Sequence, residues 1–366
     1  MSGSLVLLHL AGAIALLLYA TRMVRTGVER AYGDVLRRRL RATLRNPFAA
    51  ILAGTGLAVV LQSATAVSLL VGSFVASGIV GGAAGLIAVL GADLGSALVV
   101  KILTFDLTIV APVCLFLGTA IFLATERREW RQFGRILVGI GLLILSLQLI
   151  GEASEPLRES ALLPVIVNYL AGDPVSAFLL AAVVTWLFHS SVAAILLLVA
   201  LSARGLIPAE LGIVMVLGAN LGGGLIAAML SRTMAPAART VPFGNLVLRG
   251  AGAILALSGL MIFAPPLTAL GATAPLQIVN AHIAFNLALV VLGVPLAGLV
   301  YRFVESVMAS FATPTSPEAI AAEASALDPT VLDHPPLALA NATREVVGIC
   351  ETVEVMLKGV MEVYED

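Results

Sequence analysis

Two long apolar runs in the sequence are each interrupted near the middle by a short polar cluster. The first cluster is Gln62-Ser63-Ala64-Thr65, and a second, His189-Ser190-Ser191-Val192, follows it 127 residues later. The same shift aligns three further motifs without a gap: Gly91-Ala92-Asp93-Leu94-Gly95 with Gly218-Ala219-Asn220-Leu221-Gly222, Asn46-Pro47 with Asp173-Pro174, and Gly78 with Gly205. The chain therefore contains two copies of one unit, and its fold must accommodate a polar break in both.

The composition is that of a polytopic membrane protein. Hydrophobic residues make up 60% of the 366 residues, charged residues only 12%, and the mean hydropathy is +1.05, whereas charged residues make up about 25% of a soluble domain. The expected environment is a lipid bilayer. The net charge of -1 gives no reason to expect a nucleic-acid partner. Two cysteines, Cys114 and Cys350, are too few for a disulfide framework.

The apolar runs predict an all-α chain with about seven full spans and two hairpins. The first run lacks a positively charged leader and a small-residue cleavage site, so we expect it to be a retained span and not a signal peptide. Full spans are expected at residues 5–21, 79–100, 107–125, 136–150, 208–230, 241–264 and 276–301.

The two interrupted runs, residues 47–77 and 174–203, are predicted to be re-entrant hairpins. Backbone that leaves the helical conformation at membrane depth is tolerated only where it lines a cavity or is buried by protein. Two half-helices that enter and return would place each polar break in such a cavity. A single kinked span is the alternative for residues 47–77.

The segments that precede the two hairpins carry opposite charge. Residues 22–45 contain eight Arg against Glu29 and Asp34, and predict an amphipathic interfacial helix on the cytoplasmic side of the plasma membrane. Residues 151–173 are acidic, with Arg158 as their one basic residue. Equivalent segments on opposite sides indicate an inverted repeat, and the remaining basic residues then place the N-terminus outside and the C-terminus in the cytoplasm.

These boundaries divide the chain into four parts. Residues 1–125 form the first membrane repeat, residues 126–302 the second, and residues 303–336, with several prolines, a linker. Residues 337–366 carry apolar side chains at a period near 3.5, which predicts a cytoplasmic amphipathic helix. Its apolar face needs a partner, either another helix or a second copy of the chain in a homo-oligomer.

The glycines of the repeated Gly-Ala motif are expected to allow close helix packing. Gly91 and Gly95, and their counterparts Gly218 and Gly222, have small-xxx-small spacing. Such pairs let two helix backbones approach closely, so we interpret these residues as packing positions and not as ligands.

The motifs of both copies resemble those of the type II sodium-phosphate cotransporter family. That family has duplicated Gln-Ser-Ser-Ser hairpins, each followed by Gly-Ala-Asn-Ile-Gly-Thr-Thr, and a later His-x-x-Phe-Asn, which here reads His282-Ile283-Ala284-Phe285-Asn286. The resemblance covers residues 5–302 and implies sodium-coupled symport of inorganic phosphate by alternating access. Bacterial members often end in a PhoU-like helical domain, and residues 337–366 are similar to its first helix.

The chain departs from the family motifs at several positions. Those that bear on ligand binding are Ala64, Asp93, Ser96, Ala97, His189, Val192, Gly223 and Gly224. Because these substitutions fall in the motifs that the family uses for its ligands, a carrier of another oxyanion and a proton-coupled or exporting phosphate carrier are kept as alternatives.

The polar clusters supply the groups that an oxyanion needs inside a membrane. A buried anion requires donors in place of its lost hydration, and the N-terminus of a half-helix offers free N–H groups and a partial charge of roughly +0.5. We expect phosphate to contact Gln62, Ser63, Thr65, His189, Ser190 and Ser191, and sodium to contact Gln62, Ser68, Asp93 and Asn220. No cofactor is expected besides sodium as the coupling ion.

Ionisable groups inside the membrane are candidates for function because their burial is costly. We interpret Asp93 as a sodium ligand, with a proton carrier or a carboxylate paired with Arg249 as alternatives. Arg249 pairs with an acid or extends to the interface, with direct contact to the anion as a third alternative. His189 either titrates near neutral pH or stays neutral in place of glutamine. His282 and Asn286, one turn apart, are expected to brace the hairpins.

Two other classes of function are kept open. His189 beside Ser190, with Asp93 elsewhere, would suit an intramembrane serine hydrolase. Adjacent residues rarely reach triad geometry, however, and the sequence has no Gly-x-Ser-x-Gly elbow. A sensor or scaffold that acts through the C-terminal helix is the third interpretation. The duplicated unit favours a transporter over an enzyme.

Overall fold

The computed structural model describes residues 3–43, 46–105, 108–160, 162–263, 265–310 and 335–365. Within these ranges all regular secondary structure is helical, as the apolar runs predicted. The chain separates into two units, Met1–Ser310 and Phe311–Asp366, and each is described by itself.

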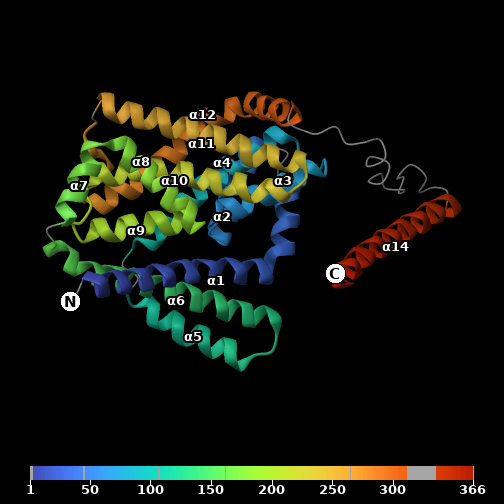
Figure 1. Cartoon of the computed structure of the whole chain (residues 1–366), viewed down its shortest axis with the longest axis horizontal. Helices are drawn as coiled ribbons and strands as arrows, with labels where there is room; N and C mark the ends of the chain where they lie inside the picture. The colour runs from blue at the N-terminus through green and yellow to red at the C-terminus, as the bar shows by residue number, and fades with distance from the viewer. Residues whose placement is uncertain are drawn as a thin grey trace. The chain divides into compact units, whose positions relative to one another are not determined.

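Twelve α-helices make up the described part of the first unit (Figure 1). They are α1 (Gly3–Thr43), α2 (Pro47–Leu61), α3 (Ala64–Ala76), α4 (Gly82–Leu103), α5 (Val110–Ala124), α6 (Arg128–Ser154), α7 (Leu162–Gly172), α8 (Pro174–Phe188), α9 (Ser191–Ala203), α10 (Ala209–Leu230), α11 (Pro236–Phe263) and α12 (Ala274–Ser310). Short 3-10 helices lie at Glu155–Glu159, Ser231–Thr233 and Leu267–Leu270.

Six of these helices are long and apolar enough to cross a membrane: α1, α4, α6, α10, α11 and α12. They coincide with six of the seven predicted spans, so the prediction of a polytopic all-α membrane protein is confirmed. The remaining span, predicted at residues 107–125, is shorter than expected. Helix α5 has 15 residues, about 22 Å, and it ends where Thr125 takes an extended backbone before charged Glu126.

Helix α1 runs without a break through the point where the first span was predicted to end. It continues from that span to Thr43, so residues 22–43 form no separate interfacial helix. The reason is a buried apolar stripe at helical spacing that crosses this point. Its members are Ala13, Leu17, Ala20, Val24 and Val28.

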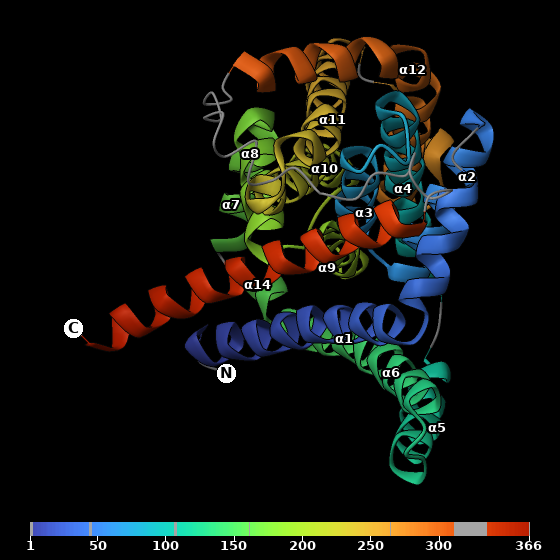
Figure 2. The ribbon, with the colours of Figure 1, turned by 90° about the vertical axis from the view of Figure 1, so that its right-hand side faces the viewer.

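Helices α1 and α6 lie side by side along this region (Figures 1 and 2). A Cβ atom added to Gly139 of α6 would lie 2.7 Å from the side chain of Val24, and one added to Gly27 of α1 would lie 2.7 Å from Ile136. Ile136 and Gly139 lie in the predicted span of α6. The residues of α1 that contact them, Val24 and Gly27, flank Arg25, so this arginine lies beside a predicted membrane span.

The duplicated unit is visible in the helix boundaries. The boundaries of three helices of the first copy recur 127 residues later: α2 and α8 have 15 residues, α3 and α9 have 13, and α4 and α10 have 22. The turn after the second hairpin helix also recurs, with Gly78 at φ 71° and Gly205 at φ 72°. The duplication is thus confirmed in the backbone, whereas the opposite orientation of the two copies in a membrane stays a prediction.

The four motif glycines bring the long helix of each copy against the first hairpin helix. A Cβ atom added to Gly91 would lie 2.3 Å from the carbonyl oxygen of Ile51, and one added to Gly218 would lie 2.0 Å from that of Phe178. Gly95 and Gly222 make the equivalent approaches one turn later, where the added Cβ would lie 2.4 Å from a carbonyl oxygen in both copies. The predicted close packing is therefore present in both copies.

Replacing Gly91 or Gly218 by alanine is expected to lower the free energy of unfolding by about 1–3 kcal/mol, the usual cost of forcing extra atoms into a packed interface. Thermal unfolding of the detergent-solubilised protein measures this loss. Gly56→Ala is the matched control, since Gly56 has nothing within 4 Å of the added Cβ. Equal melting temperatures for all three variants would contradict the packing role.

The described part of the second unit is α14 (Pro335–Glu365). It confirms the helix predicted at residues 337–366, and the side chains of Leu337, Leu339, Val346, Val353 and Leu357 are exposed on it. The predicted linker at residues 303–336 begins too early, because α12 continues to Ser310. The rest of that linker lies outside the described residues.

Candidate functional site

Each hairpin breaks at a residue in the left-handed region of backbone conformation. Gln62 ends α2 at φ 52° and ψ 30°, and His189 ends α8 at φ 51° and ψ 26°. These are the two non-glycine residues with positive φ in the described part of the chain. Such strain costs about 1–3 kcal/mol and concentrates at functional sites. Residues 47–76 thus form two helices, α2 and α3, and the re-entrant path of this hairpin stays a prediction.

The residue after each break caps the following helix. The side-chain oxygen of Ser63 accepts a hydrogen bond from the Ala66 N–H (3.1 Å), and that of Ser190 accepts one from the Ala193 N–H (3.2 Å). The preceding N–H groups of the first turn have no partner within an α-helix. Helices α3 and α9 thus each begin with free N–H groups and a partial positive charge of roughly +0.5.

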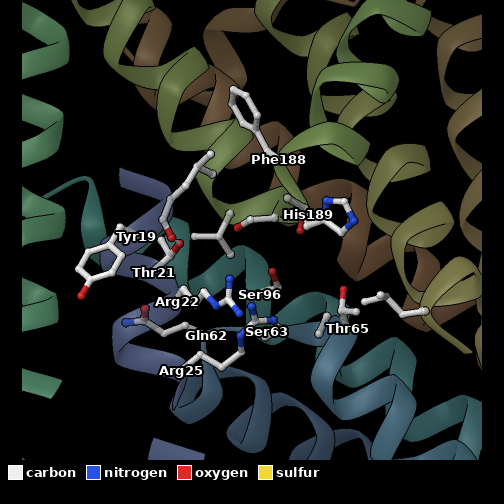
Figure 3. A pocket seen from close by; sticks show the side chains of 16 residues that line it. Tyr19, Thr21, Arg22, Arg25, Gln62, Ser63, Thr65, Ser96, Phe188 and His189 are labelled. Carbon is white, nitrogen blue, oxygen red and sulfur yellow. Dashed lines mark hydrogen bonds between the residues drawn. The ribbon is translucent and has the colours of Figure 1, made fainter. Parts of the chain in front are cut away.

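Both helix N-termini face one cavity of about 490 Å³ (Figure 3). Its lining consists of Leu18, Tyr19, Thr21, Arg22, Arg25, Gln62, Ser63, Ala64, Thr65, Ser96, Phe188, His189, Ser190, Ser191, Val192 and Leu230. All six residues predicted to contact phosphate are among them, although the two clusters are 127 residues apart. The structure therefore brings the two polar breaks together at one site.

Sequence reasoning missed two arginines of this cavity. Arg22 and Arg25 of α1 line it beside Gln62 and Ser63 (Figure 3), and Nη1 of Arg25 lies 3.5 Å from Oγ of Ser63. Among the residues that the structure describes, no carboxylate lines the cavity and none forms an ion pair with either arginine. The apolar stripe that continues beyond Thr21 was the signal that α1 would carry both side chains along the membrane unit.

Ser96 is a further cavity residue that was not predicted. It lies on α4, one turn after Asp93, and is 1% exposed. The repeat places Gly223 of α10 at the equivalent position, so this hydroxyl has no counterpart in the second copy.

A buried polar network joins four helices, and none of its residues is among those that line the cavity. Nη1 of Arg249 donates to Oδ1 of Asp93 at 2.7 Å, and its Nη2 donates to Oδ1 of Asn220 at 2.9 Å. Asn286 donates to the same Asn220 oxygen at 3.2 Å, and Nδ1 of His282 lies 3.1 Å from the amide nitrogens of both asparagines. All five residues are at most 2% exposed.

The residues predicted to bind sodium are therefore divided between two places. Gln62 lines the cavity, whereas Asp93 and Asn220 are bound to Arg249. Ser68 is buried at 1% exposure and does not line the cavity. Among the alternatives for Asp93, pairing with Arg249 is the one that the structure contains.

The structure does not assemble the hydrolase alternative. Oγ of Ser190 accepts from a backbone N–H, and Nδ1 of His189 lies 3.1 Å from the Leu187 carbonyl oxygen. Asp93 is engaged with Arg249. The hydrogen-bonded nucleophile, base and orienting acid that such catalysis requires are not formed by these residues.

Comparison with known proteins identifies the first membrane repeat. Residues 16–152 match the family described as Na+/Pi-cotransporter. The match includes the first hairpin, Arg22, Arg25 and Asp93, and the resemblance drawn from the motifs is confirmed at the level of the family. The family name and the names of the two relatives at 36–37% identity describe transport proteins, not enzymes.

The relatives of this chain extend the match over both copies. It is 37% identical over 362 residues to the "Putative inorganic phosphate export protein YjbB" of Salmonella typhimurium and 36% identical to that of Escherichia coli K12, covering 98% of this chain and 65% of each relative. It is also 26% identical over 301 residues to the "Uncharacterized protein YqeW" of Bacillus subtilis, covering 82% of this chain and 97% of that protein. No solved structure matches.

The cotransporter motifs are altered at positions that shape the site. Ala64 and Val192 place apolar side chains in the cavity lining where the motif has serine. Gly223 faces the guanidinium of Arg249, since an added Cβ would lie 3.2 Å from Nη1. The resemblance of residues 337–366 to a PhoU-like domain stays a prediction.

Proposed function

We propose that the protein carries inorganic phosphate across the membrane in symport with sodium, by alternating access to the cavity between the two hairpin breaks. One observation supports this most strongly: two helix N-termini and two arginines converge on a cavity that no carboxylate of the described residues lines. Each helix end offers N–H donors to an anion, and each guanidinium offers a planar fork that matches phosphate oxygens.

The donor set of the cavity fits a multiply charged oxyanion. Ser63, Thr65, Ser190 and Ser191 supply hydroxyl groups, and Gln62 supplies an amide. Arg22 and Arg25 would offset the negative charge of the phosphate. Helix N-termini and hydroxyl groups alone would offset only part of that charge. The site predicted from the sequence contained no fixed cation, and Arg22 and Arg25 add two.

Sodium coupling is supported by unpartnered oxygens in the first hairpin. Oε1 of Gln62 and Oγ of Ser68 are buried and have no hydrogen-bond partner among the described residues. Oxygens without a donor suit a small cation, and a cation beside the phosphate would offset its charge.

The proposed mechanism uses the two copies as inverted repeats with re-entrant hairpins. In this arrangement the Arg-rich end of α1 faces the cytoplasm of a cell whose inner membrane holds the protein, and the C-terminal helix lies on the same side. Movement of one copy against the other would then expose the shared cavity to each side in turn.

Export of phosphate is a second candidate, favoured by the charge at the cavity. The repeat equivalents of Arg22 and Arg25 are Leu149 and Glu152, so the second copy has no matching pair of arginines. In the proposed orientation Arg22 and Arg25 lie on the cytoplasmic side of the cavity, where their positive charge would attract phosphate. The names of two relatives also contain phosphate export.

Flux of labelled phosphate across proteoliposomes, with and without a sodium gradient, tests both candidates. We expect flux that rises with an inward sodium gradient and that excess sulfate does not inhibit. Indifference to sodium would remove the coupling, and transport of sulfate in place of phosphate would correct the substrate. Phosphate flux that starts only from the side of Arg22 and Arg25 and runs against the sodium gradient would decide for export. Empty vesicles and protein with Gln62→Ala are the controls.

A further inference from the structure

A fixed positive charge lies between equivalent positions of the two copies. Asp93 of α4 and Asn220 of α10 are related by the shift of 127 residues. The guanidinium of Arg249 bridges them, with Nη1 at 2.7 Å from Oδ1 of Asp93 and Nη2 at 2.9 Å from Oδ1 of Asn220. Each copy thus contributes one oxygen to the same cation.

These two oxygens are of the kind that would otherwise hold a metal cation. A carboxylate and a side-chain amide oxygen are hard acceptors, and Asp93, at 1% exposure, is too deeply buried to remain charged without a cation beside it. The Asn220 oxygen is turned toward that cation because its amide nitrogen donates to the Val216 carbonyl at 2.8 Å.

The guanidinium also lies next to the substrate cavity. A Cβ atom added to Gly223 would lie 3.2 Å from Nη1 of Arg249 and 3.3 Å from Cβ of Ser191, which lines the cavity. Arg249 and Ser191 therefore approach the same glycine. A larger residue at this position, such as the serine found at the equivalent position 96, would crowd the guanidinium.

We propose that Arg249 is a tethered cation that takes the place of one coupling sodium ion at the Asp93–Asn220 oxygen pair. This inference rests on the proposed function and refines it: sodium is left to the first hairpin, at Gln62 and Ser68, and the charge of Asp93 is offset permanently by the protein. The carrier then needs one sodium ion fewer per cycle than a carrier with the same oxygens and a neutral residue at position 249.

Arg249→Ala removes the tethered cation and should convert the oxygen pair into a sodium site. We expect the melting temperature of purified Arg249→Ala to rise with sodium chloride more than that of the original protein, with choline chloride holding the ionic strength constant. Millimolar methylguanidinium should produce a similar rise. In proteoliposomes, the Hill coefficient of phosphate flux for sodium should increase by about one.

Three variants separate this role from simple packing. In Arg249→Ala/Asp93→Asn the carboxylate is gone, so the extra response to sodium should disappear. Arg249→Lys keeps a charge and should respond to sodium as the original protein does. Arg239→Ala lies on the same helix, where Nε of Arg239 donates to the Met234 carbonyl at 2.8 Å, and should change neither response.

A sodium and methylguanidinium response of Arg249→Ala no larger than that of the double variant would overturn the inference. The inference would also be overturned if Arg249→Ala did not fold in the presence of sodium or methylguanidinium while the double variant did. Sodium would then have failed to replace the arginine. If the original protein moves no phosphate but Arg249→Ala gains the sodium response, the proposed function falls and the tethered cation stands. If the original protein moves phosphate but Arg249→Ala gains no sodium response, the proposed function stands and the tethered cation falls.

Discussion

Replacing Arg22 and Arg25 together by glutamine is expected to weaken phosphate binding by at least about 100-fold. Each hydrogen bond to a charged group contributes about 1.5–3 kcal/mol, and two lost at the low end of this range correspond to about two powers of ten in Kd. Glutamine keeps amide donors at these positions while it removes both charges. Calorimetric titration of the detergent-solubilised variant with phosphate measures the loss, and flux in proteoliposomes should fall with it.

The design of this experiment depends on where the arginines lie along α1. Arg30 is on the same helix and exposed, and it does not line the cavity, so Arg30→Gln should bind phosphate normally. Arg25→Lys tests geometry apart from charge, because lysine keeps the positive charge but loses the planar fork. Unchanged phosphate affinity in Arg22→Gln/Arg25→Gln would place the anion elsewhere and remove the main support for the proposed function.

The features that the sequence could predict are those that occur twice. A polar break in one apolar run is open to several interpretations, but its recurrence with Gly78 and Gly205 at the same offset defines one unit. The helix boundaries of the hairpins and of α4 and α10 repeat with that offset in the structure. The six residues predicted to contact phosphate could be found for the same reason, since each break supplies half of them.

The contacts that the sequence did not place are those between helices that lie far apart in the chain. The cluster of arginines after Thr21 was read as a surface feature, because such clusters usually face water on the cytoplasmic side. Packing of α1 on α6 overrides that expectation and carries Arg22 and Arg25 to the cavity. Likewise, Asp93 and Arg249 are 156 residues apart and on different helices, so no local pattern could select their pairing from the alternatives.

Replacing Ser190 by alanine is expected to lower phosphate flux by roughly 10- to 100-fold, through two effects that other substitutions separate. The hydroxyl caps α9, a contribution of about 1 kcal/mol to stability, and it also faces the cavity as a donor to the anion, worth a further 1.5–3 kcal/mol. Ser77→Ala is the control, because the hydroxyl of Ser77 donates to the Phe74 carbonyl at the end of α3 and does not line the cavity.

Ser190→Asp distinguishes the cap from the anion contact. Aspartate is as good an N-cap as serine and also suits the helix dipole, so the melting temperature should be close to that of the original protein. Its negative charge would, however, occupy the end of α9 where phosphate is proposed to bind, and flux should be lost altogether. Threonine at the same position keeps both the cap and the hydroxyl donor and should retain most of the flux. If Ser190→Asp transported phosphate at the original rate, this helix end would not hold the anion, and the second hairpin would have a structural role alone.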